Sequence, residues 1–403
     1  MFQSVEAAPP DAILGLTEAF RKDENSSKVN LGVGVYKAED GTTPLLKSVK
    51  VAEQRILEGE KTKTYVNPNN GTAEYTACVQ RMLFGDSSDI VDAGRAVSAH
   101  TPGGTGALRL AGDYLRLNHA GATIWLSDPT WANHGGIFAD AGVPTKKYGY
   151  YDAETYALDF DRMLTDLGQV PAGDVVLLHA CCHNPTGVDP SEEQWNMIAE
   201  RLAERGAVPL IDFAYQGFAA GLEEDANAVR VMSECLPELM VCSSFSKNFG
   251  LYCERVGALT VVASDASNAA NVLSQVKRAI RRNYSNPPAH GSLIVTTILG
   301  DDALAAQWRG ELKEMRDRIN GMRRLFADSL DARGTRLGRH GNGFIVDQKG
   351  MFSFSGLGPG QVKALQSEHS IYIVGDGRIN VAGMTTANMD GLCDAITAVA
   401  GGG

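Results

Sequence analysis

The chain is 403 residues long, 44% of them hydrophobic and 21% charged, so it is too apolar for a disordered protein and too long for one simple core. Its net charge of −11 is spread out without a lysine or arginine block, which argues against nucleic acid and against an anionic membrane as partner. Its seven cysteines, an odd number without a Cys-x-x-Cys pair, indicate reduced thiols in a cytoplasmic protein rather than a disulfide framework or a zinc site.

The N-terminal residues carry neither a basic segment nor an apolar one. No later apolar run approaches the roughly 18 residues that span a bilayer, so we expect neither export nor membrane insertion. Residues 29–36, Val-Asn-Leu-Gly-Val-Gly-Val-Tyr, alternate β-formers with glycines. This pattern predicts a strand with a tight bend, in which Gly34 lets the backbone approach another group closely.

Between about residues 45 and 310, apolar strand candidates alternate with helical patterns. The candidates are residues 124–127, 175–178, 208–211, 239–242 and 256–262. Continuous apolar strands separated by helices predict a mostly parallel sheet that is covered on both faces. One helix is well marked, because Ser191 is a suitable N-cap, Gln194 follows it by three residues, and Gly206 provides an end.

The pattern changes from about residue 311 to long charged helices, followed by a final strand and helix. We therefore expect an α/β protein with two domains. Residues 46–310 form the large domain of this prediction, and residues 1–45 and 311–403 together form the small one.

The segment 243–252, Ser-Ser-Phe-Ser-Lys-Asn-Phe-Gly-Leu-Tyr, places Lys247 just after a strand candidate. Most lysines are solvated surface cations, but Phe245 and Phe249 surround this one with apolar bulk. Desolvation lowers the pKa of a lysine toward the neutral amine that forms Schiff bases with carbonyl compounds. Together with the neighbouring serines and with Arg255, the amine suits a phosphorylated carbonyl cofactor.

The loop Pro-Gly-Gly-Thr-Gly at residues 102–106 precedes a predicted helix with Leu108 and Leu115 on one side. Glycine N–H groups and the helix dipole would face a group at the start of this helix, which favours phosphate. The loop matches neither the Walker nor the dinucleotide pattern. It therefore indicates a phosphate site only in combination with Lys247 and Arg255.

Polar side chains follow two further strand candidates. Asp212 and Tyr215 come after the strand candidate at residues 208–211. They lie at its carboxyl end, where open α/β sheets hold ligands. In residues 179–187 the chain leaves a strand and bends at an Asn-Pro pair, which offers Asn184 as a donor. The two histidines of this segment lack the helical i, i+4 spacing of a common metal-binding pair, so we predict no metal site.

These motifs resemble a known family. The Lys247 segment, together with Glu-Arg-Val-Gly at 254–257, closely resembles the cofactor-lysine motif of the class I aminotransferases of fold type I, the aspartate and aromatic aminotransferases. The resemblance runs from Ile13 to Met384. It implies a seven-stranded, mostly parallel sheet with a smaller α/β domain, pyridoxal 5'-phosphate as cofactor, and a homodimer with shared active sites.

The resemblance also implies a set of site residues. The cofactor would contact Gly103, Gly104, Thr105, Trp131, His134, Asn184, Asp212, Tyr215, Ser244, Ser246, Lys247 and Arg255, and also Tyr65 from a second subunit. The substrate would contact Gly34, Trp131, Asn184, Arg281 and Arg378.

Catalytic roles in the resembled family carry over to three of these residues. Lys247 would form the Schiff base and shuttle the proton, and Asp212 would keep the pyridine nitrogen protonated. Tyr215 would donate to the phenolic oxygen of the cofactor, together with Asn184. His134 would bond the aspartate, and Trp131 would lie over the cofactor ring.

Two arginines match the carboxylate-binding arginines of the family. Arg378 would hold the α-carboxylate in a bidentate fork, and Arg281 would meet the distal carboxylate from the neighbouring subunit. Gly375 and Asp376 stand before Gly377, where relatives commonly have Ala-Ser, so this departure bears on substrate affinity.

The resemblance thus implies a ping-pong aminotransferase that moves the amino group of L-aspartate to 2-oxoglutarate, giving oxaloacetate and L-glutamate. A preference for tyrosine or phenylalanine stays open, because relatives of both preferences share every quoted motif. A pyridoxal-phosphate lyase would keep Lys247 and Asp212 but would not need Arg281. A cofactor-binding regulatory module would need a basic DNA-binding segment, and the sequence has no basic block.

Overall fold

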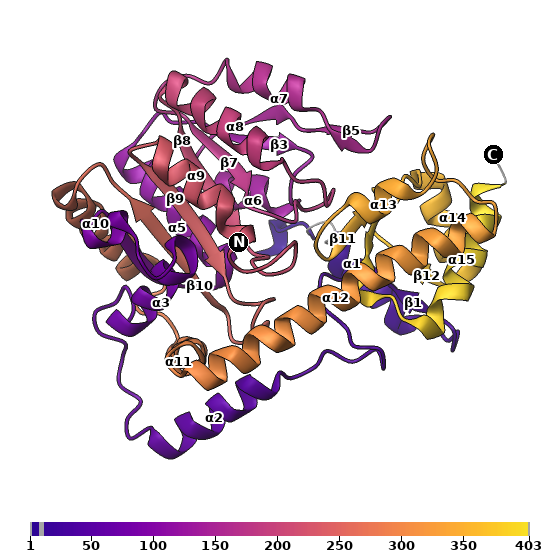
Figure 1. The fold of residues 1–403 in the computed structure, drawn as a ribbon, viewed down its shortest axis with the longest axis horizontal. Helices are drawn as coiled ribbons and strands as arrows, with labels where there is room; N and C mark the ends of the chain where they lie inside the picture. The colour runs from indigo at the N-terminus through magenta and orange to yellow at the C-terminus, as the bar shows by residue number, and fades with distance from the viewer. Residues whose placement is uncertain (1, 8–11, 402–403) are drawn as a thin grey trace.

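The computed structural model describes residues 2–7 and 12–401, and its central element is a seven-stranded sheet (Figure 1). From edge to edge the strands are β2 (Ala96–Pro102), β10 (Val256–Val262), β9 (Leu239–Ser244), β8 (Val208–Phe213), β7 (Val175–His179), β3 (Ile124–Asp128) and β4 (Thr145–Gly149). Neighbouring strands are parallel except at β10, which is antiparallel to both β2 and β9. The sheet is therefore mostly parallel, as predicted.

Helices cover both faces of this sheet (Figure 1). Along β7, Val175 and Leu177 pack into one buried apolar cluster, whereas Val176 and Leu178 pack into another. This alternation is expected of a central strand, because successive side chains point to opposite faces. One face carries α5 (Gly103–Asn118), α6 (Asn133–Ala141) and α10 (Ala266–Asn283), and the other carries α3 (Ala73–Phe84), α7 (Phe160–Leu167), α8 (Glu192–Arg205) and α9 (Asn227–Cys235).

The well-marked helix of the sequence is α8, and its boundaries are confirmed. The Ser191 hydroxyl accepts a hydrogen bond from the Gln194 N–H at 3.2 Å, and the Gln194 side chain accepts one from the Ser191 N–H at 2.9 Å. Gly206 ends the helix in the left-handed region, at φ 64°. The five strand candidates also form strands, which supports the use of apolar runs to find them.

The sequence pattern missed the two edge strands, β2 and β4. The β4 sequence, Thr-Lys-Lys-Tyr-Gly, begins with exposed residues, and polar edge strands lack the continuous apolar run of a central strand. The predicted strand at residues 29–36 was too long. Only β1 (Val29–Asn30) forms, by parallel pairing with β12 (Ile371–Tyr372).

A long helix, α12 (Asp302–Ala332), runs from the sheet region to a second group of elements (Figure 1). That group contains α1 (Ala12–Lys22), α13 (Gly343–Asp347), β11 (Phe352–Phe354), α14 (Pro359–His369), β13 (Arg378–Asn380) and α15 (Thr386–Ala400). The predicted domain boundary at 310/311 falls inside α12. The division into residues 46–310 against 1–45 and 311–403 stays a prediction.

The remaining elements are short or peripheral. They are the 3-10 helices η1 (Phe2–Ser4), η2 (Glu224–Ala226) and η3 (Val381–Gly383), the strands β5 (Tyr151–Asp152) and β6 (Ala157–Leu158), and the helices α2 (Lys47–Gly59), α4 (Asp89–Asp92) and α11 (Ala289–Leu299). Among the described residues, no helix is both long and apolar enough to cross a membrane.

Candidate active site

A cavity of about 270 Å³ lies at the carboxyl ends of β7, β8 and β9 and at the start of α5. Its lining includes most of the residues that the sequence singled out: Gly34, Gly104, Thr105, Trp131, Asn184, Asp212, Tyr215, Ser244, Ser246, Lys247, Arg255 and Arg378. Ligands of open α/β sheets bind at this edge of the sheet. The cavity is therefore the candidate active site.

Lys247 follows β9 on a short loop, and the ring of Phe245 packs edge-on against Phe249 beside it. Both phenylalanines are buried. Burial lowers the pKa of the Lys247 amine from its ordinary value, with Arg255 acting in the same direction and Asp212 against it. The amine lies 4.8 Å from the centre of the Tyr215 ring. A larger neutral fraction makes Lys247 a better nucleophile and base.

The start of α5 and the end of the Lys247 motif together form an anion site. Gly104 and Thr105 lie in the first turn of α5, where N–H groups have no partner within the helix. The Arg255 Nη1 donates to the Ser246 hydroxyl at 3.2 Å. A Cβ added to Gly103 would lie 2.4 Å from the Arg255 Nη2. Only glycine therefore lets the guanidinium pack against the helix start.

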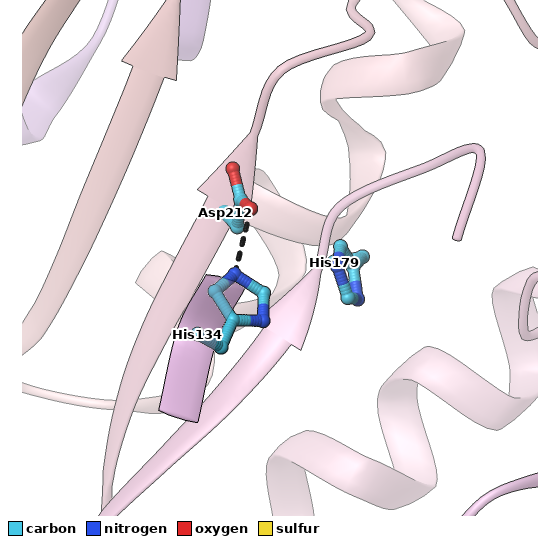
Figure 2. A group of neighbouring side chains, drawn as sticks. All are labelled: His134, His179 and Asp212. Carbon is cyan, nitrogen blue, oxygen red and sulfur yellow. Dashed lines mark hydrogen bonds and ion pairs between the residues drawn. The ribbon is translucent and has the colours of Figure 1, made fainter. Parts of the chain in front are cut away.

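Asp212 lies near the end of β8, where His134 bonds its carboxylate and His179 lies beside it (Figure 2). The His134 Nε2 is 3.1 Å from the Asp212 carboxylate, and the His134 Nδ1 is 2.8 Å from the Thr130 hydroxyl. Burial by itself would raise the pKa of Asp212, but the hydrogen bond from His134 and the electrostatic interactions with His134, His179 and Lys247 together outweigh it, and the pKa is lowered. The carboxylate is therefore ionised at neutral pH.

His134, His179 and Asp212 also form a group with metal-binding chemistry, whose ligand atoms lie within 4.8 Å of one another. Both ring nitrogens of His134 already face hydrogen-bond partners, Thr130 and Asp212. Burial lowers the pKa of His179 to about 3, so that ring is neutral. We attribute the arrangement to the positioning of Asp212, and the absence of a metal site stays a prediction.

Arg378 begins β13 and is 5% exposed. Its Nη1 donates to the Asn184 side-chain oxygen at 3.1 Å, and its Nη2 donates to the Gly32 carbonyl at 3.0 Å. Burial lowers the pKa of the Arg378 guanidinium. The Asp376 carboxylate accepts from the Arg378 N–H at 3.0 Å, so this unusual residue closes the turn before β13.

Four predicted site residues do not line the cavity. Gly103 packs under Arg255, and His134 lies behind Asp212. Tyr65 and Arg281 line a separate surface groove with residues 66–69 and 285–286. Tyr65 is 84% exposed, as expected of a residue that serves another subunit, and its role stays a prediction.

The cavity also contains residues to which the sequence assigned no role in the site. Tyr252 ends the segment 243–252, and Ala214 lies between Asp212 and Tyr215, so their neighbours could have indicated them. His179 had been considered only as a metal ligand. Phe352 comes from the distant segment at 350–356 and packs its ring 4.2 Å from the Arg378 guanidinium. No local signal in the sequence points to that contact.

Comparison with known proteins gives one consistent answer. A family model for "Aminotransferase class I and II" matches residues 26–396. The chain is 53% identical to an aspartate aminotransferase of Escherichia coli strain K12 over 399 residues, covering 99% of this chain and 100% of the relative. It is 48% identical to an aromatic-amino-acid aminotransferase of Pseudomonas aeruginosa, covering 99% and 98% of the two chains.

Solved structures agree with this comparison. An aromatic-amino-acid aminotransferase from Burkholderia pseudomallei, covalently bound to pyridoxal phosphate, has a TM-score of 0.96 at 48% identity and covers 99% of both chains. An aspartate aminotransferase from Saccharomyces cerevisiae cytoplasm has a TM-score of 0.96 at 38% identity, covering 99% of this chain and 98% of its own.

Proposed function

Because the chain belongs to the class I and II aminotransferase family, we propose that it is a pyridoxal-phosphate-dependent enzyme that transfers the amino group of L-aspartate to 2-oxoglutarate. The products are oxaloacetate and L-glutamate, formed by a ping-pong mechanism. The observation that carries the proposal is the shared cavity of Lys247, Asp212 and Arg378. It combines an amine for a carbonyl cofactor, a carboxylate for a ring nitrogen and a guanidinium for a substrate carboxylate.

The residues of the cavity fit pyridoxal phosphate. Arg255 supplies the cation that a phosphate needs, and the hydroxyls of Ser244 and Ser246 and the N–H groups at the start of α5 supply further donors. Lys247 would hold the carbonyl end, and Asn184 and Tyr215 would donate to the phenolic oxygen. Trp131 would cover the ring, and Asp212 would face its nitrogen. The solved relative with covalently bound pyridoxal phosphate supports this assignment.

When bound, pyridoxal phosphate supplies an electron-withdrawing pyridine ring that accepts the electron pair left on the substrate α-carbon. The ionised Asp212 would keep a proton on the ring nitrogen. The Lys247 amine, with its lowered pKa, would move the proton from the substrate α-carbon to the carbonyl carbon of the cofactor. Burial raises the pKa of Tyr215, so its hydroxyl stays protonated and acts as a donor.

A dicarboxylic substrate needs a second cation besides Arg378, and we assign Arg281 of a neighbouring subunit to that role. Its position with Tyr65 in a groove outside the Lys247 cavity supports a homodimer in which each subunit completes the other's site. The yeast relative, which comes from the cytoplasm, supports a cytoplasmic location.

A preference for aromatic amino acids is the second candidate, because the relatives include aromatic-amino-acid aminotransferases at 48% identity. The aspartate assignment rests on the 53% identity to an aspartate aminotransferase, because relatives of both preferences share the Arg281 motif.

Steady-state rates with L-aspartate, L-tyrosine and L-phenylalanine, each paired with 2-oxoglutarate, test the proposal. We expect the highest kcat/KM with aspartate. A higher value with tyrosine or phenylalanine would establish the aromatic candidate. Borohydride reduction and peptide mapping should place the phosphopyridoxyl group on Lys247, and a label on another lysine would contradict the assignment of the site.

A further inference from the structure

The strand that carries Arg378 belongs to a very small sheet. β13 pairs antiparallel with β11, with Arg378 opposite Phe354, and the pair forms a sheet of two three-residue strands. Isolated two-stranded ribbons are marginally stable in water. The position of Arg378 therefore depends on what holds β11 from its other side.

Arg323 of α12 holds that side. It is 1% exposed, and its Nη2 donates to the carbonyls of Phe352 and, at 2.6 Å, Gly350. Its Nη1 donates to the Ile345 carbonyl at 3.3 Å and to the Ser353 hydroxyl at 3.1 Å. It makes no ion pair with any described residue. Burial lowers the pKa of Arg323 to about 10, so the guanidinium is still charged at neutral pH and all these contacts are charge-assisted.

The segment 345–353, which Arg323 holds, contacts the active site through Phe352 and Lys349. The Phe352 ring lies 4.2 Å from the Arg378 guanidinium. The same ring fills the space beside Gly34, where an added Cβ would lie 2.8 Å from it. The Lys349 N–H donates to the Gly187 carbonyl at 2.6 Å, which joins the segment to the loop that carries Asn184.

The orientation of Arg378 matters because a bidentate carboxylate contact needs the guanidinium in one plane. Asn184 and Gly32 each accept from one of its Nη atoms, and the Nε has no hydrogen-bond partner among the described groups. The Phe352 ring limits tilting of the guanidinium. Arg323 fixes the backbone on both sides of that ring.

We propose that Arg323 is a positioning residue for Arg378, acting through the backbone of β11 and the ring of Phe352. This inference rests on the proposed role of Arg378 in binding a substrate carboxylate. Arg323 itself does not line the cavity and would not touch the substrate.

The test compares Arg323→Met, Arg323→Lys and a matched control, Arg324→Met. Arg324 is the next residue of α12 and is exposed, so the control removes a guanidinium from the same helix without touching β11. Titration calorimetry of each holoenzyme with succinate, a dicarboxylate without an amino group, reports carboxylate binding independently of catalysis. Steady-state kcat and KM for L-aspartate and the affinity of each apoenzyme for pyridoxal phosphate complete the comparison.

We expect Arg323→Met to weaken succinate binding by about tenfold, which corresponds to about 1.4 kcal/mol. KM for aspartate should rise more than kcat falls, while cofactor affinity stays unchanged. Arg323→Lys should lie between, because an ammonium can still donate to carbonyls but lacks the planar fork. Arg324→Met should behave as the unmodified protein. If Arg323→Met does not fold, the succinate affinity of Arg323→Lys decides the question.

Unchanged succinate affinity in a folded Arg323 variant would overturn the proposal. A parallel loss of succinate and cofactor affinity would also overturn it, because that result indicates a general structural role. Arg378→Lys distinguishes a failure of the proposed function from a failure of the positioning role. If Arg378→Lys leaves succinate binding intact, the proposed function fails. If it weakens binding while the Arg323 variants do not, only the positioning role fails.

Discussion

Replacing Gly103 with alanine should damage the phosphate end of the site selectively. The residue has φ 77°, and an added Cβ would lie 2.4 Å from the Arg255 Nη2 and 2.8 Å from its Cζ. Such contacts require the guanidinium to move by about 1 Å to reach normal van der Waals separation, roughly 3.5 Å. A charge-assisted hydrogen bond contributes about 1.5–3 kcal/mol. We therefore expect Gly103→Ala to raise the Kd of pyridoxal phosphate for the apoenzyme by about 10- to 100-fold.

The left-handed backbone adds a second cost that must be separated from the first. An alanine at positive φ destabilises the fold by about 1–2 kcal/mol wherever it occurs. Gly173 provides the control, because it has φ 84° and no atom within 4 Å of an added Cβ. Gly173→Ala should therefore lower the unfolding free energy without changing cofactor affinity.

Fluorescence titration of both apoenzymes with pyridoxal phosphate and with pyridoxal, which lacks the phosphate, measures the difference. The loss in Gly103→Ala should appear with pyridoxal phosphate and be small with pyridoxal. If the difference in affinity between pyridoxal phosphate and pyridoxal is the same in Gly103→Ala and Gly173→Ala, the assignment of Arg255 to the phosphate is refuted.

Three further predictions concern other parts of the protein. Arg281→Asp and Lys247→Ala should each be inactive with aspartate. Mixing the two variants under conditions of subunit exchange should restore activity, because each heterodimer then has one intact site. If mass spectrometry shows exchange but activity stays absent, a shared site is contradicted. Asp212→Asn should lower kcat by about 10²–10³-fold, the scale of a lost electrostatic contact in an active site, and stopped-flow rates near the unmodified value would remove Asp212 from the mechanism. Burial lowers the pKa of His100 to about 3, against about 6.5 in the unfolded chain, so the unfolded state binds the extra proton and stability is lost as pH falls through this window. When the pH falls from 6.5 to 5, the unfolding free energy of His100→Gln should therefore decrease by about 1.6 kcal/mol less than that of the unmodified protein. Urea unfolding at both pH values measures the two decreases, and equal decreases would show that His100 does not titrate in this way.

Local motifs made most of the site predictable. Lys247, Arg255 and the glycine loop before α5 lie in short segments whose residue types already indicate an amine and a phosphate site. The central strands were predictable for a similar reason, since a strand buried on both faces must be apolar throughout. The edge strands β2 and β4 were missed because one side of each has no neighbouring strand in the sheet, and their sequences are correspondingly more polar.

The chemical groups that this protein can bring to a reaction are evident from its sequence, because each lies in a short run of characteristic residues. How those groups meet depends on tertiary packing. Arg378 reaches Asn184 and Gly32 across sequence separations of 194 and 346 residues, and Phe352 covers it through the pairing of β11 with β13. Contacts of this kind leave no local pattern, because their position depends on the packing of α12 and two short strands rather than on the spacing of neighbouring residues. The same packing set the role we propose for Arg323, whose side chain is buried on a helix otherwise rich in exposed charge.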